Sequence, residues 1–188
     1  MAAVGCDVAT STRVLLVSGS LRAGSTNTGV LRTAAALAPS DVGTDLYDGL
    51  GALQHFDPDA DGPRPPDRVA ALRDRLHRAD AVLFCTPEYA GGLPGSFKNL
   101  LDWCIGDADV RSLYGKPVAW INASTREARW AHESLRLVLG FAHATVVEDA
   151  CVHVPVGAAD VGDDGLVVGE ARRVAISGAL ERLARASG

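Results

Sequence analysis

The chain has 188 residues, a length that favours a single domain built around one hydrophobic core. Apolar residues make up 47% of the chain and charged residues 22%, which is typical of a globular protein. The formal net charge is −5 and the sequence has no basic run, so nucleic acid is not an expected partner. No run of apolar residues is long enough to predict a membrane span, so we expect no membrane partner either.

The first dozen residues are small or polar and contain no apolar segment typical of a secretory signal. We therefore expect a flexible leader over residues 1–12, a single domain over residues 13–188, and a cytoplasmic location. The widely separated cysteines are expected to be reduced thiols, and the histidines show no metal-ligand spacing, so no metal site is predicted. The cysteines are Cys6, Cys85, Cys104 and Cys151.

Four features are predicted in the first third of the chain. The apolar run Val14–Val17 predicts a buried strand, and a helix is expected to begin near Ser25–Asn27. A weaker strand is predicted at Thr44–Tyr47. The segment Gly49–Pro66 is rich in Gly, Pro and Asp, and we expect it to be structureless and either functional or mobile.

The remainder of the chain alternates between apolar strand runs and helical patterns. Helices are predicted to begin near Pro65–Asp67, after Pro94 and near Ala128, with a closing helix around Ile176–Leu183; strands are predicted at Ala81–Cys85, Val118–Ile121 and, as a fifth strand, Thr145–Val147 with Val152–Val154. This alternation is typical of βαβ units on a parallel sheet with both faces covered. The predicted fold is a three-layer α/β sandwich.

The loop after the first predicted strand is the first candidate site. Ligands of such sheets bind beyond the carboxyl ends of the strands, and unpaired amides at a helix N-terminus attract anions. The loop Gly19–Asn27 combines two glycines with a helix start. Its side chains suited to an anion are Ser20, Arg22, Ser25, Thr26 and Asn27. The alternative is that Ser25 or Thr26 only caps the helix.

Several familiar phosphate and catalytic motifs are excluded. Gly19 and Gly24 have the GxxxxG spacing of a nucleoside-triphosphate loop, but Ser25 stands where the lysine is required. The GxGxxG, GxSxG and HExxH patterns are absent. A phosphatase CxxxxxR motif is also missing, because Gly91 occupies the arginine position after Cys85. A monophosphate site with one arginine remains.

The loop after the third predicted strand is the second candidate site. Pro87 and Pro94 stiffen its two ends, Gly91 lets the backbone approach a flat ligand, and Tyr89 offers an aromatic face. In the strand order 2-1-3-4-5, strands one and three are neighbours, so the two loops would face each other across one crevice. This arrangement suits a ligand with a phosphate at one end and a planar ring at the other.

Two sequence stretches together resemble the NADPH-dependent FMN reductase family of flavin, quinone, chromate and azo-dye reductases. They are GSLRAGSTN (Gly19–Asn27) and PEYAGGLPGSFKNLLDW (Pro87–Trp103), and the resemblance extends over roughly Arg13 to Pro155. It implies a flavodoxin-like fold whose five-stranded parallel sheet has the order 2-1-3-4-5. It also implies FMN and NADPH (or NADH) as cofactors, and a homodimer or homotetramer.

The same resemblance assigns roles to individual residues. Ser20, Arg22, Ser25 and Asn27 would bind the FMN phosphate; Pro87, Glu88, Tyr89, Ala90 and Gly91 would run along the isoalloxazine ring; Asn122, Ala123 and Ser124 would border its pyrimidine side. Lys98, Asn99, Asp102 and Trp103 would lie near a subunit interface. Hydride would pass from the nicotinamide through the flavin to a quinone, free flavin or metal oxyanion, and no catalytic side chain is assigned.

The sequence departs from the family pattern at two places. The family commonly has Asn where this chain has Ala90, and a glycine-rich loop where this chain has Ser124–Trp130. Arg126 and Arg129 either contact a dinucleotide phosphate or belong to a solvated helix start on which Trp130 packs locally. The altered loop keeps open a flavin-free regulatory module. A second alternative is an FMN electron carrier without NAD(P)H activity.

Overall fold

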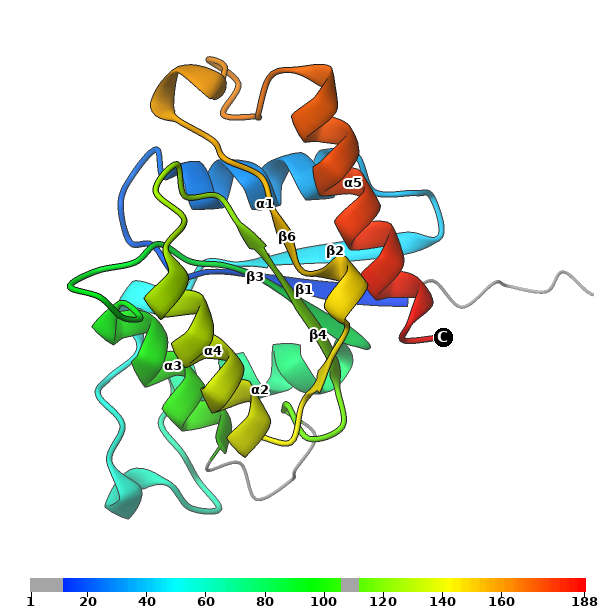
Figure 1. The fold of residues 1–188 in the computed structure, drawn as a ribbon. Helices are drawn as coiled ribbons and strands as arrows, with labels where there is room; N and C mark the ends of the chain where they lie inside the picture. The colour runs from blue at the N-terminus through cyan, green and yellow to red at the C-terminus, as the bar shows by residue number, and fades with distance from the viewer. Residues whose placement is uncertain (1–11, 106–111) are drawn as a thin grey trace, which may run out of the picture.

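A computed structural model describes residues 12–105 and 112–188 of the chain (Figure 1). The strands are β1 (Thr12–Ser18), β2 (Val42–Tyr47), β3 (Ala81–Cys85), β4 (Pro117–Asn122), β5 (Thr145–Val146) and β6 (Val152–His153). The helices are α1 (Thr26–Ala36), α2 (Asp67–Arg78), α3 (Gly95–Ile105), α4 (Arg129–Phe141) and α5 (Glu170–Arg185). The predicted leader, residues 1–12, lies outside the described residues except for Thr12, at which β1 begins.

The strands form one parallel sheet in the order β2-β1-β3-β4-β5, as predicted, and β6 also pairs with β4. The predicted fifth strand is interrupted, because the 3-10 helix Glu148–Ala150 separates β5 from β6. Glu148 and Asp149 disfavour strand structure, and Glu148 instead forms an ion pair with Arg136 of α4. The carboxyl ends of β1, β3 and β4 meet at one edge of the sheet.

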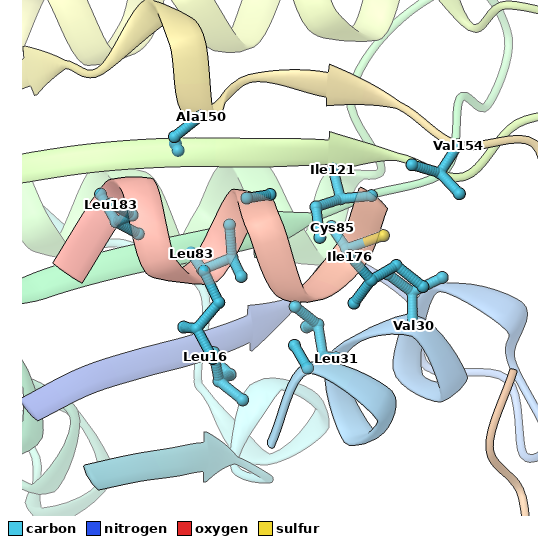
Figure 2. Close-up of a cluster of buried hydrophobic side chains, with 14 of the residues drawn as sticks. Leu16, Val30, Leu31, Leu83, Cys85, Ile121, Ala150, Val154, Ile176 and Leu183 are labelled. Atoms are coloured by element: carbon cyan, nitrogen blue, oxygen red, sulfur yellow. The ribbon is translucent and has the colours of Figure 1, made fainter. Parts of the chain in front are cut away.

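Helices cover both faces of the sheet, which gives the predicted three layers. Helices α1 and α5 lie on one face, and α2, α3 and α4 lie on the other (Figure 1). Leu16, Leu83 and Ile121 point toward α1 and α5 (Figure 2), whereas Leu15 and Phe84 point toward the opposite layer. Because both faces are buried, the strands read as continuous apolar runs instead of alternating ones. No helix in the described part of the chain is long and apolar enough to cross a bilayer.

The segment Gly49–Pro66 is more ordered than the sequence indicated. It contains two 3-10 helices, Leu50–Ala52 and Pro58–Ala60. Side chains of α3 hold its middle: Asn99 Nδ2 donates to the Gln54 carbonyl oxygen over 2.9 Å, and Asn99 Oδ1 accepts from the Phe56 amide over 2.7 Å. The prediction of a structureless segment was therefore wrong, because amide contacts from a distant helix replace regular secondary structure.

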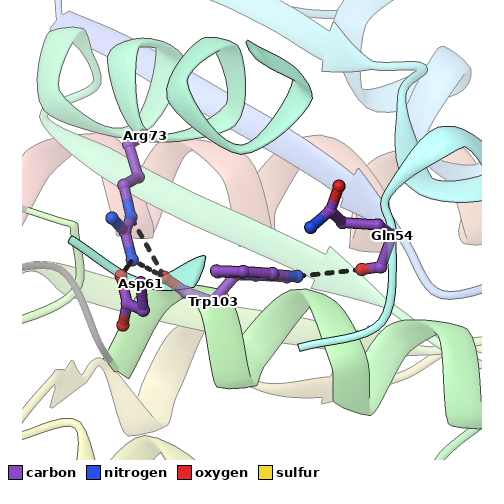
Figure 3. A network of polar contacts seen from close by, with 4 residues as sticks. All are labelled: Gln54, Asp61, Arg73 and Trp103. Carbon is purple, nitrogen blue, oxygen red and sulfur yellow. Dashed lines mark hydrogen bonds and ion pairs between the residues drawn. The ribbon is translucent and has the colours of Figure 1, made fainter. Parts of the chain in front are cut away.

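A buried polar network anchors the same segment to α2 and α3 (Figure 3). Trp103 is fully buried and donates from Nε1 to the Gln54 carbonyl oxygen over 2.9 Å. Arg73 donates from Nε and Nη2 to the Trp103 carbonyl oxygen over 3.2 and 2.8 Å. Its Nη2 also lies 2.8 Å from Asp61 Oδ1. Trp103, expected near a subunit interface, packs inside its own chain.

Candidate functional site

The loops after β1 and β3 lie side by side at the edge of the sheet. The amide of Gly19 donates to the carbonyl oxygen of Cys85 over 2.9 Å, extending the β1–β3 register by one residue. A Cβ atom on Gly19 would lie 2.2 Å from Thr86 Oγ1. Glycine is therefore required sterically where the two loops touch.

The start of α1 leaves its polar groups available for a ligand. Ser25 is the N-cap residue and is buried, yet its side chain makes no capping hydrogen bond. The alternative in which Ser25 only caps the helix is thus not realised, and the first-turn amides keep their partial positive charge. Arg22 is exposed, and within the described residues its guanidinium makes no hydrogen bond or ion pair. The Arg22 amide donates to Ser20 Oγ over 3.3 Å.

Hydroxyl and thiol groups at the ends of β1 and β3 form hydrogen bonds with this loop and with the start of α1. Ser18 Oγ lies 2.9 Å from Thr28 Oγ1 and accepts from the Ser20 amide over 3.3 Å. The Cys85 thiol donates to Asn27 Oδ1 over 3.3 Å. Strand ends β1 and β3 thereby fix the path of the loop and the direction of the Asn27 side chain.

The PEY segment, Pro87–Tyr89, leads into a tight hairpin turn. The amides and carbonyl oxygens of Tyr89 and Gly92 exchange hydrogen bonds of 3.0 and 3.1 Å. The two central residues, Ala90 and Gly91, have φ values of +51° and +73°. Two successive positive φ angles define a type I′ turn, which favours Asn or Gly at both positions. Ala90 therefore occupies a conformation that its Cβ disfavours.

Replacing Ala90 by glycine is expected to raise the free energy of unfolding by about 0.5–1 kcal/mol, because glycine adopts positive φ without the Cβ penalty. The opposite change at the neighbouring turn position, Gly91→Ala, should lower it by about 1 kcal/mol. Chemical denaturation of the two ligand-free variants measures both effects. Equal stabilities of the two variants would contradict the assignment of this turn.

The carboxylate of Glu88 in the PEY segment accepts a hydrogen bond from helix α4. Glu88 Oε2 accepts from the Ala131 amide over 3.0 Å, in the first turn of α4. A carboxylate at this position satisfies an unpaired amide and interacts favourably with the helix dipole. The Glu88 side chain thus ties the β3 loop to the start of α4, and Glu88 also lines the pocket.

The loop after β4 has an irregular path held by its own polar groups. Asn122 donates from Nδ2 to the Glu127 carbonyl oxygen, and its Oδ1 accepts from the Ser124 amide over 3.0 Å. Ser124 Oγ accepts from the Arg126 amide over 3.0 Å. Glu127 and Ala128 adopt φ values of +69° and +48°. The Asn122 side chain, predicted to border a ligand, is engaged inside this loop.

The two arginines of the β4 loop have different surroundings. Arg126 is exposed and lines the crevice. Arg129 donates from Nε to Glu133 Oε1 over 2.6 Å, and its guanidinium carbon lies 5.1 Å from the Trp130 ring centroid. Arg129 and Trp130 therefore match the interpretation as a solvated helix start, whereas Arg126 remains placed to meet a ligand.

One histidine near the site is buried. His132 Nδ1 lies 2.8 Å from the Ala128 carbonyl oxygen, and Nε2 is buried without a hydrogen-bond partner among the described residues. Burial lowers the pKa of His132, while the Ala128 contact acts in the opposite direction. His132 is therefore a buried packing residue in the first turn of α4, bonded to the carbonyl oxygen of the pocket-lining Ala128.

The three loops enclose a pocket of about 350 Å³, within the size range of small-molecule sites. Its lining is Thr26, Asn27, Pro87, Glu88, Ala123, Ser124, Thr125, Arg126, Ala128 and Val156. The other sequence-predicted residues lie outside this lining: Ser20, Arg22 and Ser25 on the β1 loop, Tyr89, Ala90 and Gly91 at the hairpin, and Asn122 at the end of β4. Thr125, Ala128 and Val156 were not predicted as ligand contacts. Thr125 and Ala128 belong to the Ser124–Trp130 stretch that departs from the family pattern, and Val156 follows the predicted strand run Val152–Val154.

The strand order, the three layers and the crevice at the carboxyl ends of β1, β3 and β4 define a flavodoxin-like α/β protein. The family model described as NADPH-dependent FMN reductase matches residues 12–159, and the chain belongs to this family. The fold and the family predicted from the sequence are both confirmed.

Individual relatives agree with this assignment. A quinone reductase of Pseudomonas putida is 37% identical over 111 residues, and an NAD(P)H-dependent FMN reductase of Pseudomonas aeruginosa is 36% identical over 112 residues. These alignments span 59% and 60% of this chain and the same shares of the relatives, so the chain matches about three fifths of their length. The solved structure of FerB, a flavoenzyme NAD(P)H:(acceptor) oxidoreductase from Paracoccus denitrificans, superimposes with a TM-score of 0.80 at 28% identity. The superposition covers 93% of this chain and 96% of the FerB chain.

Proposed function

We propose that the protein is an FMN-dependent NAD(P)H oxidoreductase that passes electrons to a small-molecule acceptor such as a quinone, a free flavin or a metal oxyanion. The observation that carries this proposal is the start of α1, where the Ser25 side chain makes no capping hydrogen bond and where the guanidinium of Arg22, three residues earlier, has no hydrogen-bond or ion-pair partner among the described residues. An anionic group fits this position, and the pocket between the loops continues from it.

The residues present fit FMN in charge and shape. Ser20, Arg22, Ser25, Thr26 and Asn27 would hold the phosphate; Pro87, Glu88, Tyr89, Ala90 and Gly91 would lie along the ring; Asn122 would hold the loop from which Ser124 reaches the ring. The chemistry that bound FMN supplies is hydride transfer between a nicotinamide and an acceptor. The chain contributes binding, orientation and a partly enclosed surface. The exposed guanidinium of Arg126, which lines the pocket, would meet a phosphate of the dinucleotide.

The purified protein provides a direct test of the proposed function. We expect a yellow protein whose visible flavin absorbance disappears when NADPH or NADH is added anaerobically. Flavin colour that persists after this addition would instead identify an electron carrier without NAD(P)H activity. A protein that stays colourless in excess FMN, with no heat of binding in calorimetry, would support the flavin-free regulatory module and overturn the proposal.

Replacing Arg22 by alanine is expected to weaken FMN binding about tenfold to a hundredfold, because a charge-assisted hydrogen bond contributes about 1.5–3 kcal/mol. Flavin fluorescence titration of the apoprotein measures the change. Arg64→Ala removes another exposed arginine from the segment between Pro58 and α2 and serves as the control. An Arg22→Ala variant that binds FMN as tightly as this control would remove Arg22 from the site.

We also propose a homodimer or homotetramer in the cytoplasm. The outer surface of α4 carries the exposed apolar side chains Trp130, Leu137 and Phe141, which suits burial against a second copy. Among the described residues, Cys85 and Cys151 carry free thiols, as is common in reducing compartments. Light scattering of the purified protein tests the assembly.

A further inference from the structure

We propose that Cys85 is a positioning residue that orients the amide of Asn27, so that Asn27 Nδ2 donates a hydrogen bond to the bound flavin nucleotide. This inference rests on the proposed function, because it concerns the same pocket. It assigns a role to a buried thiol at the end of β3 that otherwise contributes only to the core (Figure 2).

The geometry joins the thiol to the pocket through one side chain. Cys85 is fully buried, and its Sγ lies 3.3 Å from Asn27 Oδ1. Asn27 is itself 8% exposed, and the surface that it does expose lines the pocket. Within the described residues, Asn27 Nδ2 makes no hydrogen bond, so both donors of its NH2 group remain available to a ligand.

The chemistry of the thiol selects one of the two orientations of the amide. A protonated thiol is a hydrogen-bond donor and only a weak acceptor, so it favours the amide oxygen over the NH2 group as its neighbour. Burial raises the pKa of Cys85 well above its usual range, although a hydrogen bond from the Ala123 backbone opposes this shift. The thiol therefore keeps its proton at any physiological pH, and the amide oxygen stays directed toward β3.

The consequence is a fixed donor inside the pocket. With Oδ1 held by the thiol, Nδ2 at the other end of the amide is turned away from β3. An amide free to rotate would present donor and acceptor in turn, and part of the free energy of binding would be spent on ordering it. Flavin nucleotides carry phosphate, hydroxyl and carbonyl oxygens, so a fixed donor matches their acceptor-rich edge.

Alanine and serine substitutions at Cys85 distinguish the effect of losing the hydrogen-bond donor from the effect of losing side-chain volume. We expect Cys85→Ala to raise the FMN dissociation constant about three- to tenfold, the effect of one hydrogen bond, and Cys85→Ser to restore it to within twofold of wild type. Cys104→Ala and Cys104→Ser form the matched control pair at another buried cysteine, where the two variants should bind FMN alike. Thermal melting of each apoprotein shows whether folding is retained.

A double-mutant cycle with Asn27→Ala provides the decisive measurement. If Cys85 acts through Asn27, then the difference between Cys85→Ala and Cys85→Ser disappears once Asn27 is alanine. Equal FMN binding by these two Cys85 variants in the wild-type background, or an unchanged difference in the Asn27→Ala background, would overturn the inference. Failure of the wild-type protein to bind FMN would instead overturn the proposed function, so the two failures are distinguishable.

Discussion

Replacing Gly19 by alanine is expected to abolish measurable FMN binding and to lower the free energy of unfolding by about 2–3 kcal/mol. The added Cβ would lie 2.2 Å from Thr86 Oγ1, 2.6 Å from Thr86 Cβ and 3.1 Å from Phe97 Cγ. Thr86 and Phe97 are both fully buried, so neither side chain has space to move. The β1 loop must then shift away from β3, which separates the proposed anion-binding start of α1 from the rest of the pocket.

Urea denaturation and flavin titration measure the two effects of the Gly19→Ala substitution. Gly62→Ala is the appropriate control, because apart from its two chain neighbours no described residue comes within 4 Å of the Cβ that it would add. This control should change the free energy of unfolding by less than about 0.5 kcal/mol. A Gly19→Ala variant that retains the stability and FMN affinity of the control would show that the loops are farther apart in solution.

Replacing Asp61 by alanine is expected to lower the free energy of unfolding by about 3–5 kcal/mol, because it removes a carboxylate partner of a buried guanidinium. Arg73 and Asp61 lie 2.8 Å apart, and their side chains are only 7% and 9% exposed. The substitution should also loosen Gly49–Pro66, since this ion pair fixes that segment to α2. Chemical denaturation and limited proteolysis of the segment check these two expectations.

A second ion pair on the same helix provides a matched control for Asp61→Ala. Arg78 and Asp74 are also 2.8 Å apart, but their side chains are 59% and 63% exposed. Asp74→Ala should therefore change the free energy of unfolding by about 0.5 kcal/mol or less, as is usual for exposed pairs. If Asp61→Ala and Asp74→Ala lowered the free energy of unfolding by similar amounts, burial would not be the dominant effect.

The layers were predictable because burial on both faces of a parallel sheet produces continuous apolar strand runs in the sequence, whereas the strand order was implied by the family resemblance. The runs at β1, β3 and β4 are continuous and apolar, and the helices between them show one apolar face. The break in the fifth strand and the 3-10 helices after β2 were not predicted. They depend on contacts with residues far along the chain, such as the pairing of Glu148 with Arg136 and of Gln54 with Trp103.

The candidate site was predicted as a set of loops, but the tasks of individual side chains were not. Hydroxyl groups, glycines and Arg22 after the first strand indicated an anion site from local sequence alone. The capping of α4 by Glu88 and the thiol contact of Asn27 join residues 43 and 58 positions apart. Local spacing carries no information on such contacts, because the topology of the sheet brings their partners together.

The interruption between β5 and β6 has a consequence for how the sheet meets other chains. An unpaired outer strand offers a row of amide and carbonyl groups to which a foreign strand can add. Here the outer strands on the β4 side are each two residues long, and a 3-10 helix lies between them. That border is too short and too irregular to template an intermolecular ladder, so among the described strands the six-residue β2 on the opposite border is the one at which strand addition from another chain would begin.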